Sequence, residues 1–332
     1  MKRMLFCVFV FLTVFFMTGC MNSGKDDVLK NLSKKINDSK GYYLTGQMEI
    51  INNEESYKYD VDVSFSKEDN FKVSLKNQTN NHQQIILRNS DGVYVLTPSL
   101  NKSFKFQSDW PYNNSQSYLL QMIISDIEND DEYNIAENDG GYIITSKVNY
   151  SNNQSLVKQK VYIDKNVNIN KVEVLDNNDV VKIKVTFSTI DLNSTFDSDY
   201  FKLENCMKSA SIEDESVTVG NIEEIIFPMH IPEDTYLSAQ EKVYVESGER
   251  VILTFTGAKP FVLVQETVRV GDELVIPTSG EPLMILDTIG SISDSSVNWV
   301  SNGIEYYISS NVLSKPELLD VANSLSVMPV GK

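Results

Sequence analysis

Apolar side chains recur at every second position through most of the chain between residues 41 and 203. In the segment 57–66, YKYDVDVSFS, two tyrosines, two valines and a phenylalanine fall on one side of an extended chain. Short polar turns such as Asn89-Ser90-Asp91-Gly92 separate these segments. The pattern predicts about eleven antiparallel strands, each with one apolar face. Because a long twisted meander curls, we expect a half-closed antiparallel β-barrel.

One segment with a helical period precedes this alternation and another interrupts it. Residues 26–40 carry Val28, Leu32 and Ile36 near one face, and residues 115–129 are rich in leucine and isoleucine at helical spacing. These segments predict helices that cover the barrel, plug its interior or line a cavity inside it. The first domain is therefore predicted to span residues 26–206.

The amino-acid composition of the chain changes after residue 206. Residues 207–216, MKSASIEDES, read as a polar linker, and the sequence beyond them is richer in proline and acidic residues. Asn302-Gly303 predicts a tight hairpin, and Ser314 with Glu317 three residues later predicts a capped helix. Residues 207–332 are thus expected to form a smaller α+β domain, which makes the whole protein α+β and mainly β.

The N-terminus has the three parts of a secretory signal. A short basic start is followed by the uncharged apolar run Leu5–Met17 and then by small residues. Thirteen residues is fewer than the roughly 20 that a membrane-spanning helix needs. We therefore predict that residues 1–19 are a signal peptide that is removed.

Cys20 stands directly after this signal. Met17-Thr18-Gly19-Cys20 resembles a bacterial lipobox, in which the cysteine sulfur receives a diacylglyceryl group and becomes the first residue. Two fatty chains, palmitate for example, anchor a protein firmly to a membrane. Residues 20–25 would then be a tether, and the protein would lie on the extracytoplasmic face of the cell membrane. An ordinary secretory cleavage beside a chance cysteine is the alternative.

Charge and motif content exclude several function classes. The formal net charge is −17, and an acidic chain is repelled by nucleic acid and by anionic lipid surfaces. Two isolated histidines, His82 and His230, suggest neither a metal site nor a catalytic pair. The acidic stretch 126–137 lacks the glycine that a calcium loop requires at its sixth position. We predict no catalytic residue, no metal and no cofactor, although an envelope hydrolase stays a minor alternative.

The apolar strand faces allow two readings. They form either an ordinary packed core or the wall of a pocket for an acyl chain, because both produce the same binary pattern. The aromatic and aliphatic candidates for such a lipid pocket are Phe65, Phe71, Val73, Phe104, Phe106, Trp110 and Leu119.

Several features together carry a family resemblance. The lipobox, the meander with one central helix and the closing segment 194–203, STFDSDYFKL, resemble the LolA-like lipoprotein carrier superfamily. The C-terminal part adds Phe227-Pro228, Trp299, Gly303 and Tyr306. With this addition the chain resembles the YdcC type of sporulation lipoprotein, with the GerS and RseB/MucB proteins as more distant relatives.

The resemblance implies a non-enzymatic envelope lipoprotein. It would bind a lipid, an acyl chain or a protein partner in a sporulation- or germination-related role. The alternative it implies is a regulatory sensor that binds a membrane-bound partner of the anti-sigma type. Trp299 and Tyr306 are the candidate partner contacts.

Overall fold

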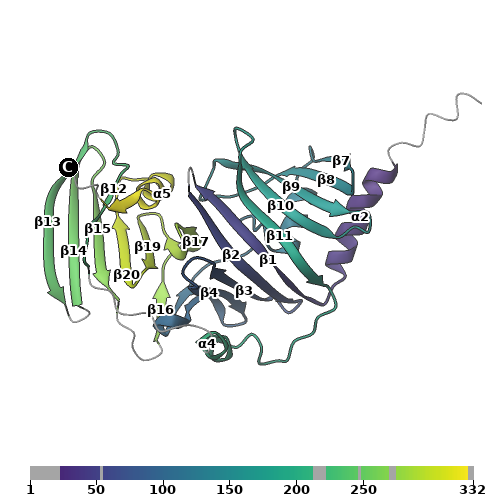
Figure 1. Ribbon diagram of the computed structural model, residues 1–332, viewed down its shortest axis with the longest axis horizontal. Coiled ribbons are helices and arrows are strands. Elements are labelled where there is room, and N and C mark those ends of the chain that lie inside the picture. Colours follow the sequence, from purple (N-terminus) through teal and green to yellow (C-terminus); the bar gives the residue numbers. More distant parts are fainter. Residues whose placement is uncertain (1–22, 53–54, 212–221, 246–247, 269–273, 328–332) are drawn as a thin grey trace, which may run out of the picture.

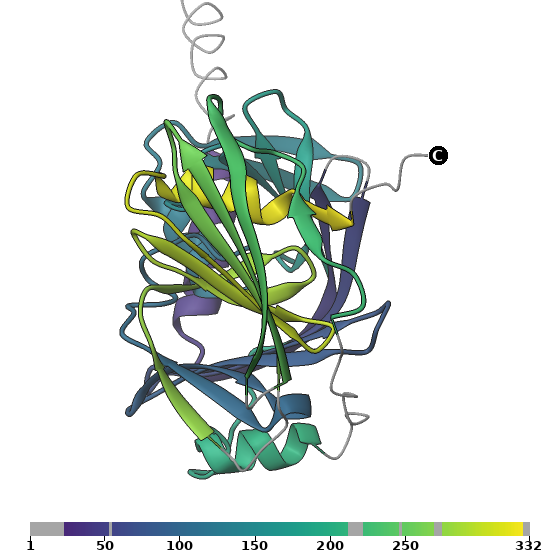
Figure 2. The same ribbon diagram turned by 90° about the vertical axis from the view of Figure 1, so that its left-hand side faces the viewer.

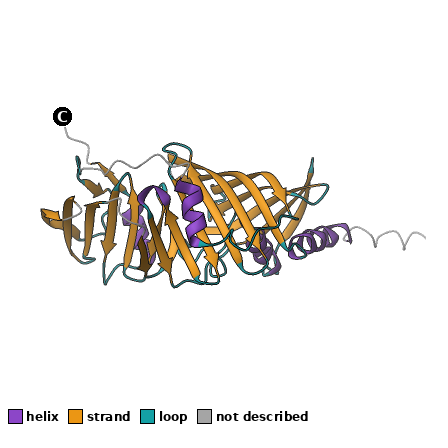
Figure 3. Ribbon diagram, turned by 90° about the horizontal axis from the view of Figure 1, so that it is seen from below, coloured by secondary structure: helices purple, strands orange, loops and turns teal. Residues whose placement is uncertain are grey.

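The structure is a computed structural model that describes residues 23–52, 55–211, 222–245, 248–268 and 274–327. The predicted signal peptide, the lipobox residues Met17, Thr18 and Gly19, and Cys20 lie outside the described residues. Two β-sheets lie end to end along the long axis of the molecule, with the larger sheet built mainly from the N-terminal half (Figures 1 and 3).

Within the described residues the larger sheet has twelve strands in the order β16-β6-β5-β4-β3-β2-β1-β11-β10-β9-β8-β7. Its two end strands do not pair with each other, so the curled sheet stays open, as predicted. The first eleven strands are β1 (Gly41–Asn52), β2 (Glu55–Ser66), β3 (Asn70–Asn77), β4 (Gln83–Asn89), β5 (Gly92–Thr97), β6 (Lys102–Phe106), β7 (Asn134–Asn138), β8 (Gly141–Lys147), β9 (Leu156–Asp164), β10 (Ile169–Asp176) and β11 (Val181–Asp191).

The twelfth strand comes from far along the chain. Strand β16 (Leu274–Thr278) pairs with β6 in parallel, whereas every other strand pair of this sheet is antiparallel. This strand belongs to the predicted C-terminal domain, yet it completes the sheet of the first domain. The two parts of the chain therefore share a continuous hydrogen-bonded sheet.

Three of the described α-helices pack on the larger sheet, namely α2 (Ser23–Asn37), α3 (Leu120–Glu128) and α4 (Leu203–Ser211). A short 3₁₀ turn, η1 (Pro98–Leu100), joins β5 to β6. The apolar sides of α2 and α3 bury residues such as Leu32 and Ile123 in one continuous core with the strands. Helix α4 covers the other face of β4 and β5, where Cys206 and Met207 are buried. It runs across the predicted domain boundary, so residues 207–211 are helix and not linker.

The smaller sheet contains seven of the described strands in the order β13-β14-β15-β20-β19-β18-β17, and β12 and β21 form a separate pair. Helix α5 (Lys315–Asn323) lies across the sheet (Figure 2). The strands are β12 (Ile226–Pro228), β13 (Thr235–Val245), β14 (Gly248–Gly257), β15 (Phe261–Thr267), β17 (Glu281–Ile285), β18 (Thr288–Ile292), β19 (Ser296–Ser301), β20 (Ile304–Ser309) and β21 (Leu325–Val327).

Two local predictions for this part are confirmed. Asn302 and Gly303 have φ of 50° and 75° and join β19 to β20, as a tight hairpin requires. The Glu317 carboxylate accepts hydrogen bonds from the Ser314 backbone N–H at 2.9 Å and hydroxyl at 2.8 Å, so the predicted capping pair begins α5.

The hairpin β17–β18 connects the two sheets. Ile289 and the partly buried Met284 pack into the core of the larger sheet. The buried side chain of Gln84 on β4 accepts hydrogen bonds from the Ile289 N–H at 2.6 Å and the Thr288 hydroxyl at 2.9 Å. It also donates to the Ile289 carbonyl at 3.1 Å. The hairpin is thus held against the larger sheet by both apolar packing and a buried polar contact.

Candidate functional site

A cavity of about 540 Å³ lies where the two sheets meet. Its volume is in the range of 300–1,000 Å³ that is typical of small-molecule sites. One wall comes from the larger sheet, with Ile50 on β1, Ile86 on β4 and Ile183 on β11. The opposite wall comes from the hairpin β17–β18 and from α5, with Leu283 and Asp320 as examples. The cavity is therefore completed only when both parts of the chain are folded together.

Trp110 in the loop after β6 is fixed at one side of this cavity. Its backbone carbonyl accepts a hydrogen bond from an Nη of Arg88 at 2.7 Å. Arg88 in turn makes two hydrogen bonds to Asp69, at 2.7 and 2.9 Å. An arginine that is held by a carboxylate on one side positions its remaining donor well. The buried indole ring therefore belongs to a preorganised wall.

Charged and polar side chains make up a large part of the cavity lining, among them Asn114, Gln116, Asn152, Lys182, His230 and Asp320. Lys182 on β11 lies 3.7 Å from the carboxylate of Asp176. His230 follows β12, and its backbone N–H donates to the hydroxyl of Ser324 at 3.0 Å. A lining that mixes apolar and polar side chains suits a molecule that has both a hydrocarbon part and a polar part.

The seven predicted pocket residues are distributed over three places. Trp110 lines the cavity between the sheets. Phe104 and Phe106 line a much smaller space of about 20 Å³ against β18 and β19. The other four, Phe65, Phe71, Val73 and Leu119, are buried in the packed core of the larger sheet. For these four the core reading of the strand pattern describes the structure, because helices α2 and α3 fill the interior at this level.

The two predicted partner contacts are inside the smaller domain. Trp299 is 1% exposed and Tyr306 is 8% exposed, and their rings stack with a centroid separation of 5.2 Å. They occupy neighbouring strands in one register pair. A partner could reach neither ring without unfolding the sheet, so we assign both residues to the core under α5.

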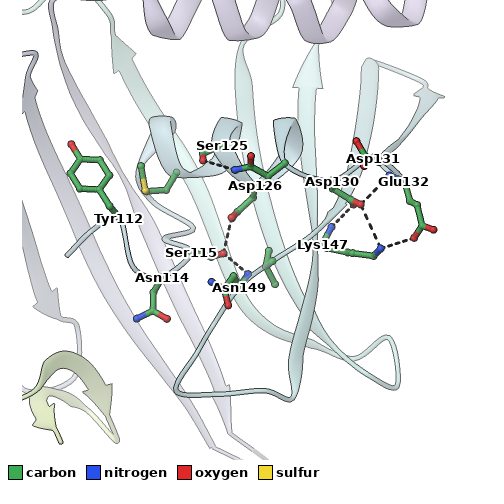
Figure 4. Close-up of a pocket in the computed structure, with 13 residues that line it drawn as sticks. Tyr112, Asn114, Ser115, Ser125, Asp126, Asp130, Asp131, Glu132, Lys147 and Asn149 are labelled. Carbon is green, nitrogen blue, oxygen red and sulfur yellow. Dashed lines mark hydrogen bonds and ion pairs between the residues drawn. The ribbon is translucent and has the colours of Figure 1, made fainter. Parts of the chain in front are cut away.

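A second, polar pocket of about 520 Å³ lies beside α3 (Figure 4). Ser115 donates to Asp126 at 2.9 Å and accepts from the Asn149 backbone N–H at 2.7 Å. Asp130 accepts from the Lys147 backbone N–H at 2.8 Å. Burial raises the pKa of the Asp126 carboxyl to about 6, against the lowering effect of its hydrogen bond from Ser115. These acidic groups tie α3 to the strands, and their oxygens already accept hydrogen bonds from the chain.

Within the residues that the structure describes, no three side chains of His, Cys, Asp or Glu come together as a metal site. Among the described helices none has the length and apolar character needed to cross a membrane. His82, in the turn before β4, has its Nδ1 3.4 Å from the hydroxyl of Ser99 and lies far from His230 in the sequence.

Most residues of the cavity wall were not predicted from the sequence. Ile86 and Ile183 belong to alternating strands, and their pattern is the same as that of core residues. Met284 and Ile289 were missed because nothing in the sequence shows that the hairpin β17–β18 reaches the first domain. The wall also contains Asn152, from the loop between β8 and β9, for which the sequence offers no signal.

Comparison with known proteins identifies the family. Residues 1–201 match the family model described as sporulation protein YdcC-like. The chain belongs to this family. The curated sporulation protein YdcC of Bacillus subtilis (strain 168) is 33% identical over 317 residues, which are 95% of this chain and 94% of that protein. The predicted resemblance to the YdcC type is confirmed.

Two solved structures illustrate the wider neighbourhood of this YdcC-like chain. The MucA/MucB complex of Pseudomonas aeruginosa has a chain that is 12% identical, with a TM-score of 0.32 and coverage of 92% of this chain and 99% of that one. The complex of the CwlD amidase with the GerS lipoprotein of Clostridioides difficile has a chain that is 21% identical, with a TM-score of 0.31 and coverage of 51% and 95%. Superpositions this loose transfer no function.

Proposed function

We propose that this YdcC-like protein is a lipid-anchored envelope protein that acts in sporulation by binding an apolar ligand between its two sheets, without catalysing a reaction. The cavity at the junction carries this proposal, because apolar side chains from both sheets and a preorganised tryptophan line part of its wall and can lie against a hydrocarbon chain. The name of its curated relative supports the sporulation role. The lipobox-like segment at residues 17–20 supports anchoring at the extracytoplasmic face of the cell membrane.

Ligand binding is tested on the mature chain carrying Cys20→Ser, which keeps every described residue. The protein is purified without detergent, extracted with organic solvent and analysed for lipid by mass spectrometry. It is then titrated with a fluorescent fatty acid. Co-purified lipid and saturable binding at one site are expected, whereas a chain that neither carries lipid nor binds the fatty acid would overturn the proposal.

Two tryptophan substitutions on β11 test whether the ligand occupies this cavity. Ile183→Trp puts a bulky ring into the cavity from β11, and Thr186→Trp adds the same ring at an exposed position on that strand. We expect Ile183→Trp to abolish binding of the fluorescent fatty acid and Thr186→Trp to retain it. Unfolding midpoints of both variants show whether each one is folded.

Anchoring is tested by growing cells with radiolabelled palmitate. We expect the full-length protein to incorporate label and Cys20→Ala to lose both label and membrane attachment. Cys7→Ala should remain labelled, because that cysteine lies within the predicted signal peptide. A sporulating culture that carries Cys20→Ala in place of the wild-type gene shows whether attachment is needed, with spore yield as the measurement.

A further inference from the structure

Strand β13 forms the outer edge of the smaller sheet. It pairs with β14 from Thr235 to Val245, and none of the described strands pairs with its other side. Figure 1 shows it at the end of the molecule farthest from the larger sheet. Eleven residues make this free edge about 37 Å long. Native proteins usually shorten, cover or charge such an edge, because its unpaired backbone groups can bind another extended chain.

Apolar side chains are exposed along β13 and directly before it. Tyr244 is 81% exposed and Tyr236 is 63% exposed. Among the described residues eleven large apolar side chains are exposed, and six of them lie between residues 229 and 245, namely Met229, Ile231, Tyr236, Leu237, Val243 and Tyr244. None of these six lines the cavity between the sheets, so the ligand proposed above does not cover them. A concentration of exposed apolar groups indicates an interaction site.

The second half of β13 has the geometry that a further strand requires. Its register with β14 shifts between Leu237 and Ala239 and is regular from Ala239 to Val245. This regular part is about as long as a typical strand. An extended peptide that pairs with it would gain main-chain hydrogen bonds, and its alternate side chains would contact Val243 on one face and Tyr244 on the other.

The charge of the smaller domain determines which partner suits this edge. Residues 222–327 contain 16 acidic and 5 basic side chains, a formal net charge of −11. The four basic side chains that the structure describes in this range are all in ion pairs, Lys242–Glu249, Arg250–Glu266, Lys259–Glu317 and Lys315–Asp294. Glu233, Asp234 and Glu241, on β13 or directly before it, have no such ion pair with a described residue.

These uncompensated carboxylates disfavour two other occupants of the edge. A second copy of the chain would bring a second domain with a charge of −11 against the first, and an anionic membrane would also repel it. A cationic segment would instead be attracted to Glu241 while its backbone pairs with the strand.

We propose that β13 is a docking edge for a protein partner, which adds an extended segment rich in lysine, arginine and β-branched residues to the smaller sheet. The segment pairs with residues 239–245, packs against Val243 and Tyr244, and places a basic side chain beside Glu241. This edge is separate from the cavity, so the inference goes beyond the proposed ligand binding and does not depend on it.

The test measures fluorescence anisotropy of a fluorescein-labelled peptide, Arg-Val-Lys-Val-Thr-Val-Lys-Val-Arg, with the mature Cys20→Ser chain. One control peptide has glutamate in place of each basic residue. The other has proline in place of each valine, which keeps the charge but removes backbone donors and favours polyproline II over a strand. We expect saturable binding of the first peptide alone, and we expect salt to weaken it.

Two charge reversals locate the binding site on the protein. Glu241→Lys should weaken binding of the cationic peptide at least about fivefold, because it replaces an attraction by a repulsion. Asp139→Lys makes the same change of net charge at an exposed turn between β7 and β8, and it should change the affinity less than about twofold. Both positions are exposed, so both variants should unfold at the urea midpoint of the wild type.

Several results would overturn this inference. They are no binding of the cationic peptide at millimolar concentration, equal binding of either control peptide, or equal loss of affinity in Glu241→Lys and Asp139→Lys. A dimer in sedimentation velocity that Tyr244→Ser dissociates would assign the edge to a second copy. Binding to phosphatidylglycerol vesicles that Tyr244→Ser abolishes would assign it to a membrane. Titration of the same variants with the fluorescent fatty acid reports on the cavity separately, so failure of either proposal is distinguishable from failure of the other.

Discussion

Replacing Gln84 with leucine should weaken the contact between the two sheets of the molecule. Gln84 is 5% exposed and makes hydrogen bonds to both backbone groups of Ile289 and to the hydroxyl of Thr288. Leucine has a similar size but no polar atoms, so the variant keeps the packing volume and leaves three buried groups of the hairpin without this partner. The contact between β4 and the hairpin β17–β18 then loses its polar part.

The expected cost follows from those three groups. A buried donor or acceptor that is left unpaired destabilises a protein by about 1–3 kcal/mol. Partial hydration from the adjacent cavity reduces the sum, so we expect a loss of roughly 2–5 kcal/mol in the free energy of unfolding. This is a large fraction of the total stability of a typical domain, about 5–15 kcal/mol.

Urea unfolding with tryptophan fluorescence measures this effect in each sheet separately. The chain has two tryptophans, Trp110 beside the larger sheet and Trp299 in the smaller one. In single-tryptophan versions, the wild-type background should give coincident transitions, and Gln84→Leu should lower and separate them.

Gln83→Leu is the matched control on the same strand. Gln83 donates to Ser74 at 2.6 Å, a contact inside the larger sheet that does not reach the hairpin. We expect a loss of at most about 1 kcal/mol and no separation of the two transitions. A Gln84→Leu protein that is as stable as Gln83→Leu, and whose two transitions still coincide, would show that the Gln84 contact does not hold the hairpin against β4.

Three further predictions concern individual residues. The pKa of Asp126 is raised to about 6, so its ionisation lowers the free energy of unfolding as pH rises from about 4 to 6. Asp126→Asn should therefore be more stable than the wild type at pH 7, by at most about 3 kcal/mol. A variant whose urea unfolding depends on pH as the wild type does would contradict this prediction. Contact with Lys259 and the Ser314 cap lowers the pKa of Glu317 to about 2. The stabilisation by the Glu317 carboxylate is therefore present above about pH 4.5 and is lost as pH falls towards 2. Glu317→Gln should lower the free energy of unfolding by about 1 kcal/mol at pH 7, and equal urea midpoints of variant and wild type at pH 7 would contradict this prediction. A Cβ on Gly290 would lie 2.4 Å from the carbonyl oxygen of Asn298, so Gly290→Ala should cost about 1–3 kcal/mol; a wild-type melting temperature would show that the hairpin shifts freely.

The strands and their faces were predictable from the sequence because each repeats a local pattern. The alternation around Val61 and Val63 matches their burial in β2, and the cap at Ser314 matches the start of α5. Helix α3 begins at Leu120 and not at Ser115, because Ser115 instead bonds to Asp126 and Asn149. Local sequence patterns therefore predict which helices and strands form better than they predict the residues at which these elements begin and end.

The cavity was not predictable in the same way. Its walls depend on the contact of the hairpin β17–β18 with β4, which joins residues about 200 positions apart through Gln84. A binary pattern assigns Phe71 and Ile86 the same environment, although the first fills the core and the second lines the cavity. The aromatic pair Trp299 and Tyr306 was misplaced because large rings in a strand pattern are equally compatible with a surface and a core position, and the structure buries both.

The parallel pairing of β16 with β6 has a consequence for the order in which the protein matures. A nascent chain completes β6 at Phe106, but the strand that covers its free edge arrives only with residues 274–278. Until then the growing polypeptide carries an unsatisfied ladder of backbone groups, which is a template for aggregation with a second copy. A product truncated before residue 274 keeps that edge of β6 exposed. Premature termination or proteolysis in this region therefore yields an aggregation-prone fragment and not a smaller functional protein.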